Sequence, residues 1–491
     1  MRYRIGIDIG TTNTKAVLYD EALTPVAASS ATYKTYHEQL GFAEQDPDEV
    51  LQAFKQVLGE VLATVSTAGD SVELLAFSGA MHSLILVDGE GRPLTRSIIW
   101  SDNRAVVEVE AFKATADWLA HYRRTGTPVH SMSPFFKLLW LKRHTTLLDE
   151  AARCIGIKDY ILHYLCGEYV CDYSLASATG LFNLRELAWD REALDYLEIS
   201  SDLLPVPLDG DTRIPVRNRD FLQQLGLPLD LQLVPGASDG CLANLGGFAL
   251  GDRETTVTIG TSGAVRMTVA EPLFDPEGKT FCYYLTRGKW VIGGAINNGG
   301  NVLQWLDGIL YGGEGQIYEA LEASAPQIAI GSDGLLFVPY LFGERAPHWD
   351  GRLRASFQGL NAFHTKAHLL RAAVEGLLYN LREVWERLQS LAGKSTKVIA
   401  SGGFLRSPVW TGMMADIFGV DLYGADEQDS SCLGAVLLAG AGGESVEAPE
   451  LRVISYSGER HDAYGECYQK YLWYTRKLVA LQAEARERFG E

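Results

Sequence analysis

The chain has 491 residues, of which 47% are hydrophobic and 21% are charged, and its formal net charge at pH 7 is −19. This length allows two or three domains with large cores, and the negative charge argues against nucleic acid or an anionic membrane as a main partner. No apolar run approaches the roughly 20 residues that span a bilayer, and the seven cysteines contain no CxxC pair. We therefore expect a cytoplasmic protein with reduced thiols rather than a zinc or disulfide framework.

The first predicted element is a strand hairpin over residues 3–20, which contains the sequence RIGIDIGTTNTK. Gly10 in its turn lets backbone N–H groups approach an anion closely, and the hydroxyls of Thr11 and Thr12 add donors. Asp8 precedes this turn, and its carboxylate would repel a bare phosphate but can hold Mg²⁺ together with phosphate oxygens. An acidic turn residue without a ligand is the alternative for so short a motif.

Several helices and short strands follow, together with a loop-rich stretch over 183–230 that we expect to form a covering subdomain. The predicted helices cover 48–67, 105–123, 134–144 and 158–166, and the predicted strands cover 72–77, 84–87 and 98–100. Polar and aromatic residues gather after two of these strands, namely His82, Trp100, Asp102 and Arg104. Such a cluster suits a polyhydroxylated ligand, whereas a core histidine and a helix N-cap are the alternatives.

A short strand at 232–234 leads into the sequence PGASDG, in which small residues flank Asp239. A substrate hydroxyl can therefore reach this carboxylate. Phosphoryl transfer to an alcohol needs a carboxylate that accepts the hydroxyl proton and little other covalent help. An aspartate in a tight turn or at a helix N-cap is the alternative, and it would be preferred for this motif in isolation.

A second hairpin begins near residue 251 and repeats the pattern of the first, with the turn Gly260-Thr261-Ser262. The elements predicted after it are strands at 280–285, 289–293, 334–338 and 397–401, helices at 302–310, 364–391 and 462–489, and a linker at 440–450. Gly402 and Gly403 allow a flat base or ribose to lie against the backbone, and an ordinary strand-to-helix loop is the alternative. Two hairpins of one kind favour two lobes that bind one polyphosphate, as in a nucleotide-using phosphotransferase.

Taken together, these motifs resemble the FGGY carbohydrate kinases of the actin, hexokinase and heat-shock-chaperone ATPase superfamily. The resemblance runs from Ile5 to about Ala441, and further matching sequences lie at 43–47, 298–306, 343–347, 401–403 and 431–435. It implies an α/β fold of two actin/hexokinase-like (ribonuclease H-like) lobes with a nucleotide cleft between them. It also implies an N-terminal lobe over 1–247, a C-terminal lobe over 248–445, and a linker and helix over 446–491.

The resemblance assigns roles to individual residues. Asp8 would organise Mg²⁺ and phosphate, and Asp239 would be the catalytic base. The residues implied for ATP binding are Gly10, Thr11, Thr12, Asn13, Lys15, Gly260, Thr261, Gly300, Gln304, Gly402, Gly403 and Ser407.

The resemblance also bears on the substrate. Glycerol kinases carry an Arg-Glu pair where this chain has Met81 and His82, which disfavours glycerol. The runs AMHSLI, WSDNR and MSPFFKL look most like the gluconate kinases of the family, although xylulose kinases share the Met-His pair. A gluconate carboxylate needs a cationic partner or several hydrogen-bond donors, for which His82, Arg104 and Lys137 are candidates; Lys137 is alternatively a solvated helix residue. The substrate-binding residues implied are Ala80, Met81, His82, Trp100, Asp102, Arg104, Met132 and Asp239.

We therefore expect ATP-dependent phosphorylation of D-gluconate to 6-phospho-D-gluconate, with Asp239 as general base. A xylulose or other ketopentose kinase is the first alternative. An ATP-dependent conformational module, or a sugar sensor without turnover, is the non-enzymatic alternative. The expected partners are a sugar or sugar acid and ATP with Mg²⁺, and a homodimer is a family-level expectation.

Overall fold

The computed structural model describes residues 1–64, 70–249, 251–425, 429–440 and 451–489. They form two compact units, each assembled from separate parts of the chain. The first unit contains Met1–Leu250, Thr268–Ile292 and Gln428–Ala448, and the second contains Gly251–Met267, Gly293–Glu427 and Pro449–Glu491. The predicted boundaries after 247 and 445 stay predictions, and most of the predicted linker at 440–450 lies outside the described residues.

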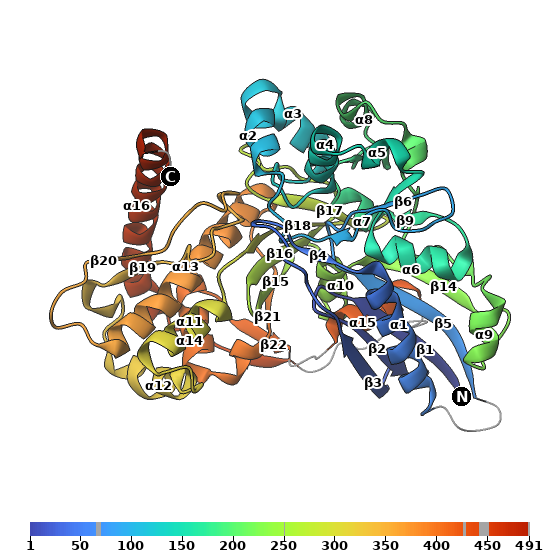
Figure 1. The fold of residues 1–491 in the computed structure, drawn as a ribbon. Helices are drawn as coiled ribbons and strands as arrows, with labels where there is room; N and C mark the ends of the chain where they lie inside the picture. Colours follow the sequence, from blue (N-terminus) through green and yellow to red (C-terminus); the bar gives the residue numbers. More distant parts are fainter. Residues whose placement is uncertain (65–69, 250, 426–428, 441–450, 490–491) are drawn as a thin grey trace. The chain divides into compact units, whose positions relative to one another are not determined.

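A six-stranded sheet forms the centre of the first unit, with the strand order β13-β14-β5-β1-β2-β3 (Figure 1). Its strands are β1 (Arg2–Ile9), β2 (Asn13–Tyr19), β3 (Pro25–Thr32), β5 (Ser71–Gly79), β13 (Ile214–Pro215) and β14 (Gln232–Ser238). β1 pairs antiparallel with β2 and parallel with β5, and β5 pairs parallel with β14. The predicted hairpin at 3–20 is confirmed, and the parallel strands β1, β5 and β14 end at one edge of the sheet.

The second large sheet has the order β17-β18-β16-β15-β21-β22-β23. Its strands are β15 (Glu254–Ile259), β16 (Gly263–Val269), β17 (Phe281–Thr286), β18 (Lys289–Ile296), β21 (Lys397–Ser401), β22 (Leu422–Ala425) and β23 (Arg452–Ile454). β15 pairs antiparallel with β16 and parallel with β21, β21 pairs parallel with β22, and β22 pairs antiparallel with β23. The first sheet shows the same order of antiparallel and parallel pairings along β2, β1, β5, β14 and β13. The repeat in the sequence therefore extends to most of both sheets.

Helices pack around both sheets, and ten short strands of the described residues form five separate two-stranded pairs. The helices are α1 (Pro47–Leu62), α2 (Val106–Thr115), α3 (Trp118–Thr125), α4 (Pro134–His144), α5 (Leu147–Glu150), α6 (Ile157–Cys166), α7 (Tyr173–Ser177), α8 (Arg191–Leu197), α9 (Arg219–Gln224), α10 (Asp239–Gly246), α11 (Gly300–Leu310), α12 (Ile317–Ser324), α13 (Lys366–Ala392), α14 (Pro408–Phe418), α15 (Ser430–Leu438) and α16 (Gly458–Phe489). The short strands are β4 (Glu44–Gln45), β6 (Ile85–Val87), β7 (Ser97–Ile98), β8 (Arg153–Ile155), β9 (Val170–Asp172), β10 (Phe182–Asn183), β11 (Ala188–Trp189), β12 (Val206–Leu208), β19 (Leu336–Val338) and β20 (Ser356–Gln358).

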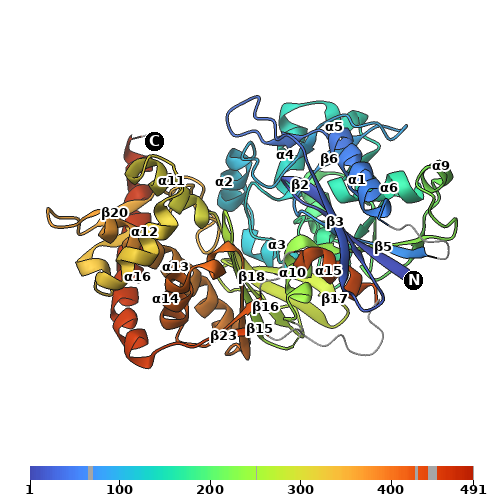
Figure 2. The same ribbon diagram turned by 90° about the horizontal axis from the view of Figure 1, so that it is seen from below.

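The two faces of the first sheet bury different side chains of β1. Ile5 and Ile7 are completely buried in a hydrophobic core shared with α1 and α6. Because side chains alternate along a strand, Gly6 and Asp8 face the other side, where α15 packs against β1 and α10 (Figure 1 and Figure 2). A Cβ on Gly6 would lie 2.3 Å from the Cys432 carbonyl oxygen, so only glycine permits this approach. Asp8 therefore lies on the face that carries α10.

The predicted helix at 105–123 is wrong in one respect, because the segment forms two helices, α2 and α3. Between them Ala116 is extended, and the Asp117 carboxylate accepts the Ala120 N–H at 3.0 Å and so begins a new helix. The predicted helix at 134–144 and strand at 397–401 are confirmed.

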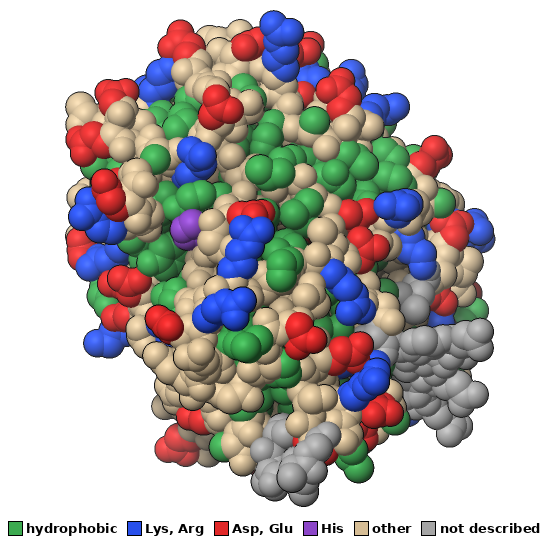
Figure 3. Space-filling view, turned by 90° about the vertical axis from the view of Figure 1, so that its right-hand side faces the viewer, with side chains coloured by type: hydrophobic (Ala, Val, Ile, Leu, Met, Phe, Trp, Pro, Cys, Tyr) green, Lys and Arg blue, Asp and Glu red, His purple; other side chains and the backbone are tan. Residues whose placement is uncertain are grey.

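Two further observations concern partners. Among the described residues, none of the helices combines the length and the apolar character that crossing a membrane requires. On the face drawn in Figure 3, Lys and Arg side chains of the described residues stand among Asp and Glu side chains rather than in one basic patch.

Candidate functional site

The turn of the first hairpin is fixed by hydrogen bonds from the surrounding chain. The Gly10 N–H donates to the Asn13 carbonyl at 3.0 Å, and Trp100 Nε1 donates to Thr11 Oγ1 at 3.0 Å. Thr12 is exposed at the turn. Trp100, which we expected to contact the sugar, thus orients this glycine turn.

Two further residues predicted to bind the nucleotide have protein partners. Lys15 on β2 forms an ion pair with Asp429, directly before α15, and Asn13 Nδ2 donates to Ser30 Oγ at 2.9 Å. Lys15 therefore links β2 to α15, and a nucleotide-binding role for either side chain stays a prediction.

The carboxylates of Asp8 and Asp239 are close enough to influence each other. Ser78 Oγ donates to Asp8 Oδ1 at 2.6 Å, and Asp239 begins α10, where its Oδ1 accepts the Gly240 N–H at 2.6 Å. Burial raises the pKa of Asp8 to about 6, and the negative charge of Asp239 adds to this rise. Two like charges so placed favour a cation beside them or a proton on one of them.

This pair of carboxylates fits Mg²⁺ that is bound together with a nucleotide. Magnesium usually takes one or two protein carboxylates and completes its six ligands with water and phosphate oxygens. In the described part of the chain, no group of three or more His, Cys, Asp or Glu side chains could hold a metal by itself. Asp8 and Asp239 are therefore suited to a cation that arrives with phosphate.

His82 lies just beyond the end of β5 with a backbone φ of 70°, which is uncommon for a residue other than glycine. Its Nδ1 lies 2.7 Å from the Ala178 carbonyl. A carbonyl can only accept, so Nδ1 carries the hydrogen and Nε2 is an acceptor in the neutral ring. The Ala80 N–H donates to the Ile9 carbonyl at 2.8 Å. The structure therefore brings the segment of Ala80, Met81 and His82 next to the first hairpin.

Asp102 and Arg104, both expected to contact the substrate, bind each other. Asp102 is completely buried, and its carboxylate accepts Arg104 Nε at 2.9 Å, Arg104 Nη2 at 2.8 Å and the Ala43 N–H at 2.7 Å. Arg104 also pairs with Glu44 at 2.5 Å, and its side chain is only 4% exposed. The pair fixes the segment that carries Trp100, and a contact of Asp102 or Arg104 with the substrate stays a prediction.

Lys137 is neither a solvated helix residue nor free to bind a substrate carboxylate. It is completely buried on α4, and its ammonium donates to the carbonyls of His82 at 2.5 Å, Ile98 at 3.0 Å and Ile99 at 2.8 Å. Burial lowers the pKa of Lys137 to about 7. Lys137 therefore supports the backbone of His82. Met132, which was expected to bind the substrate, is buried, with 2% of its surface exposed.

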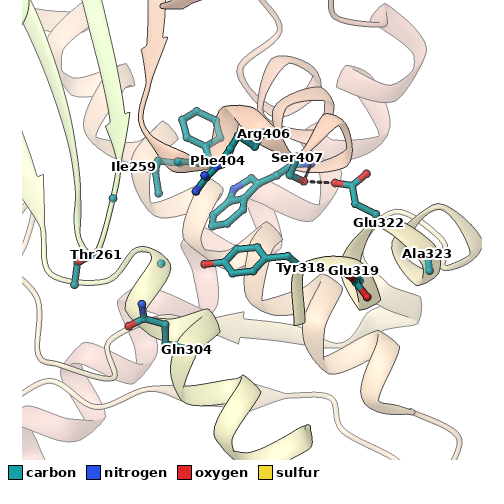
Figure 4. Close-up of a pocket in the computed structure, with 14 residues that line it drawn as sticks. Ile259, Thr261, Gln304, Tyr318, Glu319, Glu322, Ala323, Phe404, Arg406 and Ser407 are labelled. Atoms are coloured by element: carbon teal, nitrogen blue, oxygen red, sulfur yellow. Dashed lines mark hydrogen bonds between the residues drawn. The ribbon is translucent and has the colours of Figure 1, made fainter. Parts of the chain in front are cut away.

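The second unit contains a cavity of about 770 Å³, a size typical of ligand pockets. Six residues predicted to bind the nucleotide line it: Gly260, Thr261, Gly300, Gln304, Gly403 and Ser407. Figure 4 shows Thr261 and Gln304 toward one end and Ser407 and Glu322 toward the other, with Tyr318 between them. The cavity therefore runs from the turn of the second hairpin to an end formed by α12 and α14.

The start of α11 is tied to the second hairpin. The Gly300 N–H donates to the Gly260 carbonyl at 2.8 Å, and the Asn301 N–H donates to the Thr261 carbonyl at 3.1 Å. These bonds bring the positive end of the α11 macrodipole to the cavity, where it favours an anion.

Gly402 does not line the cavity, although it precedes a residue that does. Its φ is 112°, and a Cβ would lie 2.2 Å from the Ile259 carbonyl oxygen. Gly402 is therefore required for the close approach of two backbones, whereas Gly403 presents its backbone to the cavity. Ser407 caps α14 by accepting the Trp410 N–H at 3.0 Å, and its hydroxyl donates to Glu322.

The sequence did not indicate several residues that line the cavity. The unpredicted lining residues are Ile259, Tyr318, Glu319, Glu322, Ala323, Phe404, Arg406 and Trp410. Tyr318 and Glu322 are one helical turn apart on α12, a spacing that could have indicated a shared face. No motif marks this helix, so the sequence alone gave no reason to connect it with the hairpin.

Comparison with known proteins identifies the family. Residues 3–246 match the N-terminal domain, and residues 255–442 the C-terminal domain, of the FGGY family of carbohydrate kinases. The chain is 42% identical over 446 residues to the gluconokinase of Bacillus subtilis, covering 89% of this chain and 86% of that protein. It is 28% identical over 492 residues to a xylulose kinase of Staphylococcus epidermidis, covering 98% of both.

Solved structures agree on the fold. A ligand-bound xylulose kinase from Lactobacillus acidophilus has a TM-score of 0.93 at 34% identity, covering 99% of this chain and all of that one. A gluconate kinase from the same organism has the same TM-score and identity, with coverage of 98% and 99%. These matches confirm the predicted two-domain α/β fold of the actin/hexokinase-like type. The chain belongs to the FGGY family of carbohydrate kinases and is a carbohydrate kinase.

Proposed function

We propose that this kinase transfers the γ-phosphoryl group of ATP to D-gluconate and forms 6-phospho-D-gluconate. The observation that carries the proposal is the pair of Asp8 and Asp239 beside the Gly10 turn, in a chain that is 42% identical to a gluconokinase over most of its length. Family membership supports an enzyme over a conformational module or a sensor without turnover. The seven free thiols support a cytoplasmic location.

In the proposed reaction Asp239 is the general base. The terminal hydroxyl oxygen of gluconate forms a bond to the γ-phosphorus, its proton passes to the Asp239 carboxylate, and the bond from the γ-phosphorus to the β,γ-bridging oxygen breaks to release ADP. Asp8 would hold Mg²⁺, which would neutralise phosphate charge when bound.

The remaining predicted residues divide between sugar and nucleotide. Thr11 and Thr12 would donate hydrogen bonds to phosphate, and His82 with Trp100 would orient the sugar acid. The cavity of the second unit would bind adenosine, with Tyr318 against the base and the Gly260 turn toward phosphate. An aromatic face and an exposed glycine backbone suit a flat, partly charged ligand of this kind.

The choice of gluconate rests on sequence similarity. The gluconokinase relative is 42% identical and the xylulose kinase relative 28% identical. The two structures from Lactobacillus acidophilus are equally similar to this chain, so fold similarity does not separate these substrates. Xylulose is the second candidate.

A coupled assay of ADP release over a panel of sugars and sugar acids tests the proposal. We expect saturable, Mg²⁺-dependent ADP release with D-gluconate, and a kcat/KM for gluconate at least about tenfold above that for D-xylulose, the contribution of one well-placed hydrogen bond to a charged group. Saturable turnover of xylulose without turnover of gluconate would replace the first assignment by the second.

A further inference from the structure

The segment 297–301 leads from β18 into α11 and meets the turn of the second hairpin. Asn301 closes this segment on itself, because its Nδ2 donates to the Asn297 carbonyl at 2.9 Å and its Oδ1 accepts the Gly299 N–H at 2.8 Å. The backbone N–H of Asn301 also donates to the Thr261 carbonyl at 3.1 Å. The position of the segment therefore decides how the start of α11 and the hairpin turn lie at the cavity.

Glu344 holds the other end of the segment from a completely buried position. Its Oε1 accepts the Asn297 N–H at 2.6 Å and the Arg345 N–H at 2.9 Å. Its Oε2 accepts Asn298 Nδ2 at 3.0 Å and Asn380 Nδ2 at 2.8 Å. An ionised carboxylate has about four acceptor positions, and these donors use all of them. Glu344 thus acts on the surrounding chain rather than on a ligand.

Only an ionised side chain satisfies the partners of Glu344, because all of them are N–H donors. Asn298 cannot turn its amide, since its Nδ2 also donates to the Gly343 carbonyl at 2.8 Å and its Oδ1 accepts the Phe342 N–H at 3.1 Å. Burial raises the pKa of Glu344 to about 7, although the hydrogen bonds from Asn297 and Asn298 oppose this rise. A buried charge costs free energy, and a residue that only filled space would avoid this cost.

Arg345, the next residue, binds the same segment through its side chain. Its Nε donates to Asn297 Oδ1 at 2.7 Å, and its Nη2 donates to the Ile296 carbonyl at 3.0 Å. Gly300, which lines the cavity, follows shortly after these residues. The family-matching sequence at 343–347 therefore fixes the backbone directly before α11.

We propose that Glu344 is a positioning residue for the nucleotide, which holds the segment 297–301 so that the start of α11 and the turn of the second hairpin meet a phosphate group. The inference rests on the proposed binding of a nucleotide in this cavity. Among the described residues, Glu344 has no hydrogen bond to α12 or α14, which form the other end of the cavity. Glu344 should therefore affect the binding of phosphate groups and leave the binding of adenosine unchanged.

Calorimetry of ADP and of adenosine, each without sugar, separates the two ends of the cavity in the full chain. Glu344→Gln keeps the size of the side chain, but its amide nitrogen must face N–H donors. We expect the affinity for ADP to fall at least about tenfold, because a hydrogen bond to a charged group is lost and the segment shifts. The affinity for adenosine should stay within about threefold of wild type.

Asn380→Leu is the matched control. Asn380 on α13 also donates to Oε2 of Glu344 but lies outside the segment, so both variants lose a bond at the same oxygen. Asn380→Leu should lower the thermal stability and keep ADP affinity within about threefold of wild type. A further variant, Asn301→Ala, breaks two bonds of the segment itself and should reproduce the selective loss of ADP affinity.

Equal losses of ADP and adenosine affinity in Glu344→Gln, or no loss of either, would overturn the inference. If Glu344→Gln does not fold, Asn301→Ala decides, because an unchanged ADP affinity there contradicts the inference equally. A wild type that binds neither ADP nor adenosine would refute the proposed nucleotide site and this inference with it. A wild type that binds ADP but phosphorylates no gluconate would refute only the proposed substrate.

Discussion

The two hairpins of this chain have the same geometry and different chemistry. In the first, Asp8 on β1 is paired in register with Ser78 on the parallel strand β5, and the Ser78 hydroxyl donates to the carboxylate at 2.6 Å. In the second, Thr258 on β15 is paired in register with Ser401 on the parallel strand β21, and the two hydroxyls lie 2.9 Å apart. One position of the repeat is therefore an acid in one unit and a hydroxyl in the other.

The two turns also have different surroundings: carboxylates lie beside the first turn, and a cavity lies beside the second. Beside the first turn a second carboxylate, Asp239, begins α10, and the pKa of Asp8 is raised. Beside the second turn a cavity of about 770 Å³ has an aromatic side chain and a helix N-terminus at its wall. A duplicated scaffold can thus carry a pair of carboxylates in one copy and a cavity in the other, because the turn tolerates either residue at the strand end.

The largest effect is expected at Asp239. Asp239→Asn keeps the size of the side chain but removes the proton acceptor, so kcat with gluconate should fall by roughly 10²- to 10⁴-fold, with ATP affinity within about threefold of wild type. Steady-state kinetics and calorimetry measure the two quantities. Asp220→Asn is a matched control, because Asp220 also lies in the first turn of a helix and is exposed. Near-normal turnover in Asp239→Asn would remove this residue from the mechanism.

On the nucleotide side, the largest loss is expected at Gly402. An added Cβ would lie 2.2 Å from the Ile259 carbonyl oxygen at a φ of 112°, so Gly402→Ala must displace the loop that carries Gly403. We expect ATP affinity to fall about tenfold or more. Gly412→Ala on α14 is the control, since its Cβ meets no atom within 4 Å. Equal ATP affinity in both variants would contradict the role of this loop.

Asp8 should show a conflict between stability and activity. Its pKa is raised to about 6 in the folded chain, from about 4 in an unfolded one. The stability contributed by the protonated form is present below pH 4 and is lost as the pH rises through 6. Asp8→Asn should therefore be more stable than wild type at pH 8 without Mg²⁺, by at most about 3 kcal/mol, and similar to it at pH 4.

Urea unfolding at the two pH values measures this difference. Because the Asp8 side chain is partly exposed, solvent screening should keep the difference in stability below the limit of about 3 kcal/mol. If the free energy of unfolding had the same pH dependence in Asp8→Asn and wild type, burial of the Asp8 carboxylate would not destabilise the folded protein.

The smallest effect is expected at the matched position of the second hairpin. Thr258→Val removes the contact with Ser401 and should cost about 1 kcal/mol of stability. ATP affinity should change less than about threefold, because the side chain of Thr258 does not line the cavity. Thermal unfolding and calorimetry measure both values, and a loss of ATP affinity above tenfold would contradict the comparison.

The sequence predicted the parts of the molecule that depend on local patterns. Alternating strands and glycine turns indicated both hairpins, and the periodic segments at 134–144 and 397–401 have the observed bounds. The split between α2 and α3 was missed because the capping bond of Asp117 lies inside a continuous helical pattern.

Side-chain partners were harder to predict, because they depend on residues distant in the sequence. Asp102 and Arg104 were expected at the sugar, yet they bind each other, the Ala43 N–H and Glu44. Lys137 was expected to be solvated or to meet a substrate, yet it supports the carbonyl of His82. The position of α12 at the cavity likewise depends on tertiary packing, and no local motif predicts it.

The division between the two hairpins can be tested by single-turnover transfer of labelled phosphate from ATP to gluconate, at saturating ATP and Mg²⁺. The matched pair Asp8→Asn and Thr258→Val changes the same position of the repeat in each unit. We predict that transfer slows at least about 100-fold in Asp8→Asn and stays within about threefold of wild type in Thr258→Val. Equal slowing in both variants would contradict the assignment of the chemistry to the first hairpin.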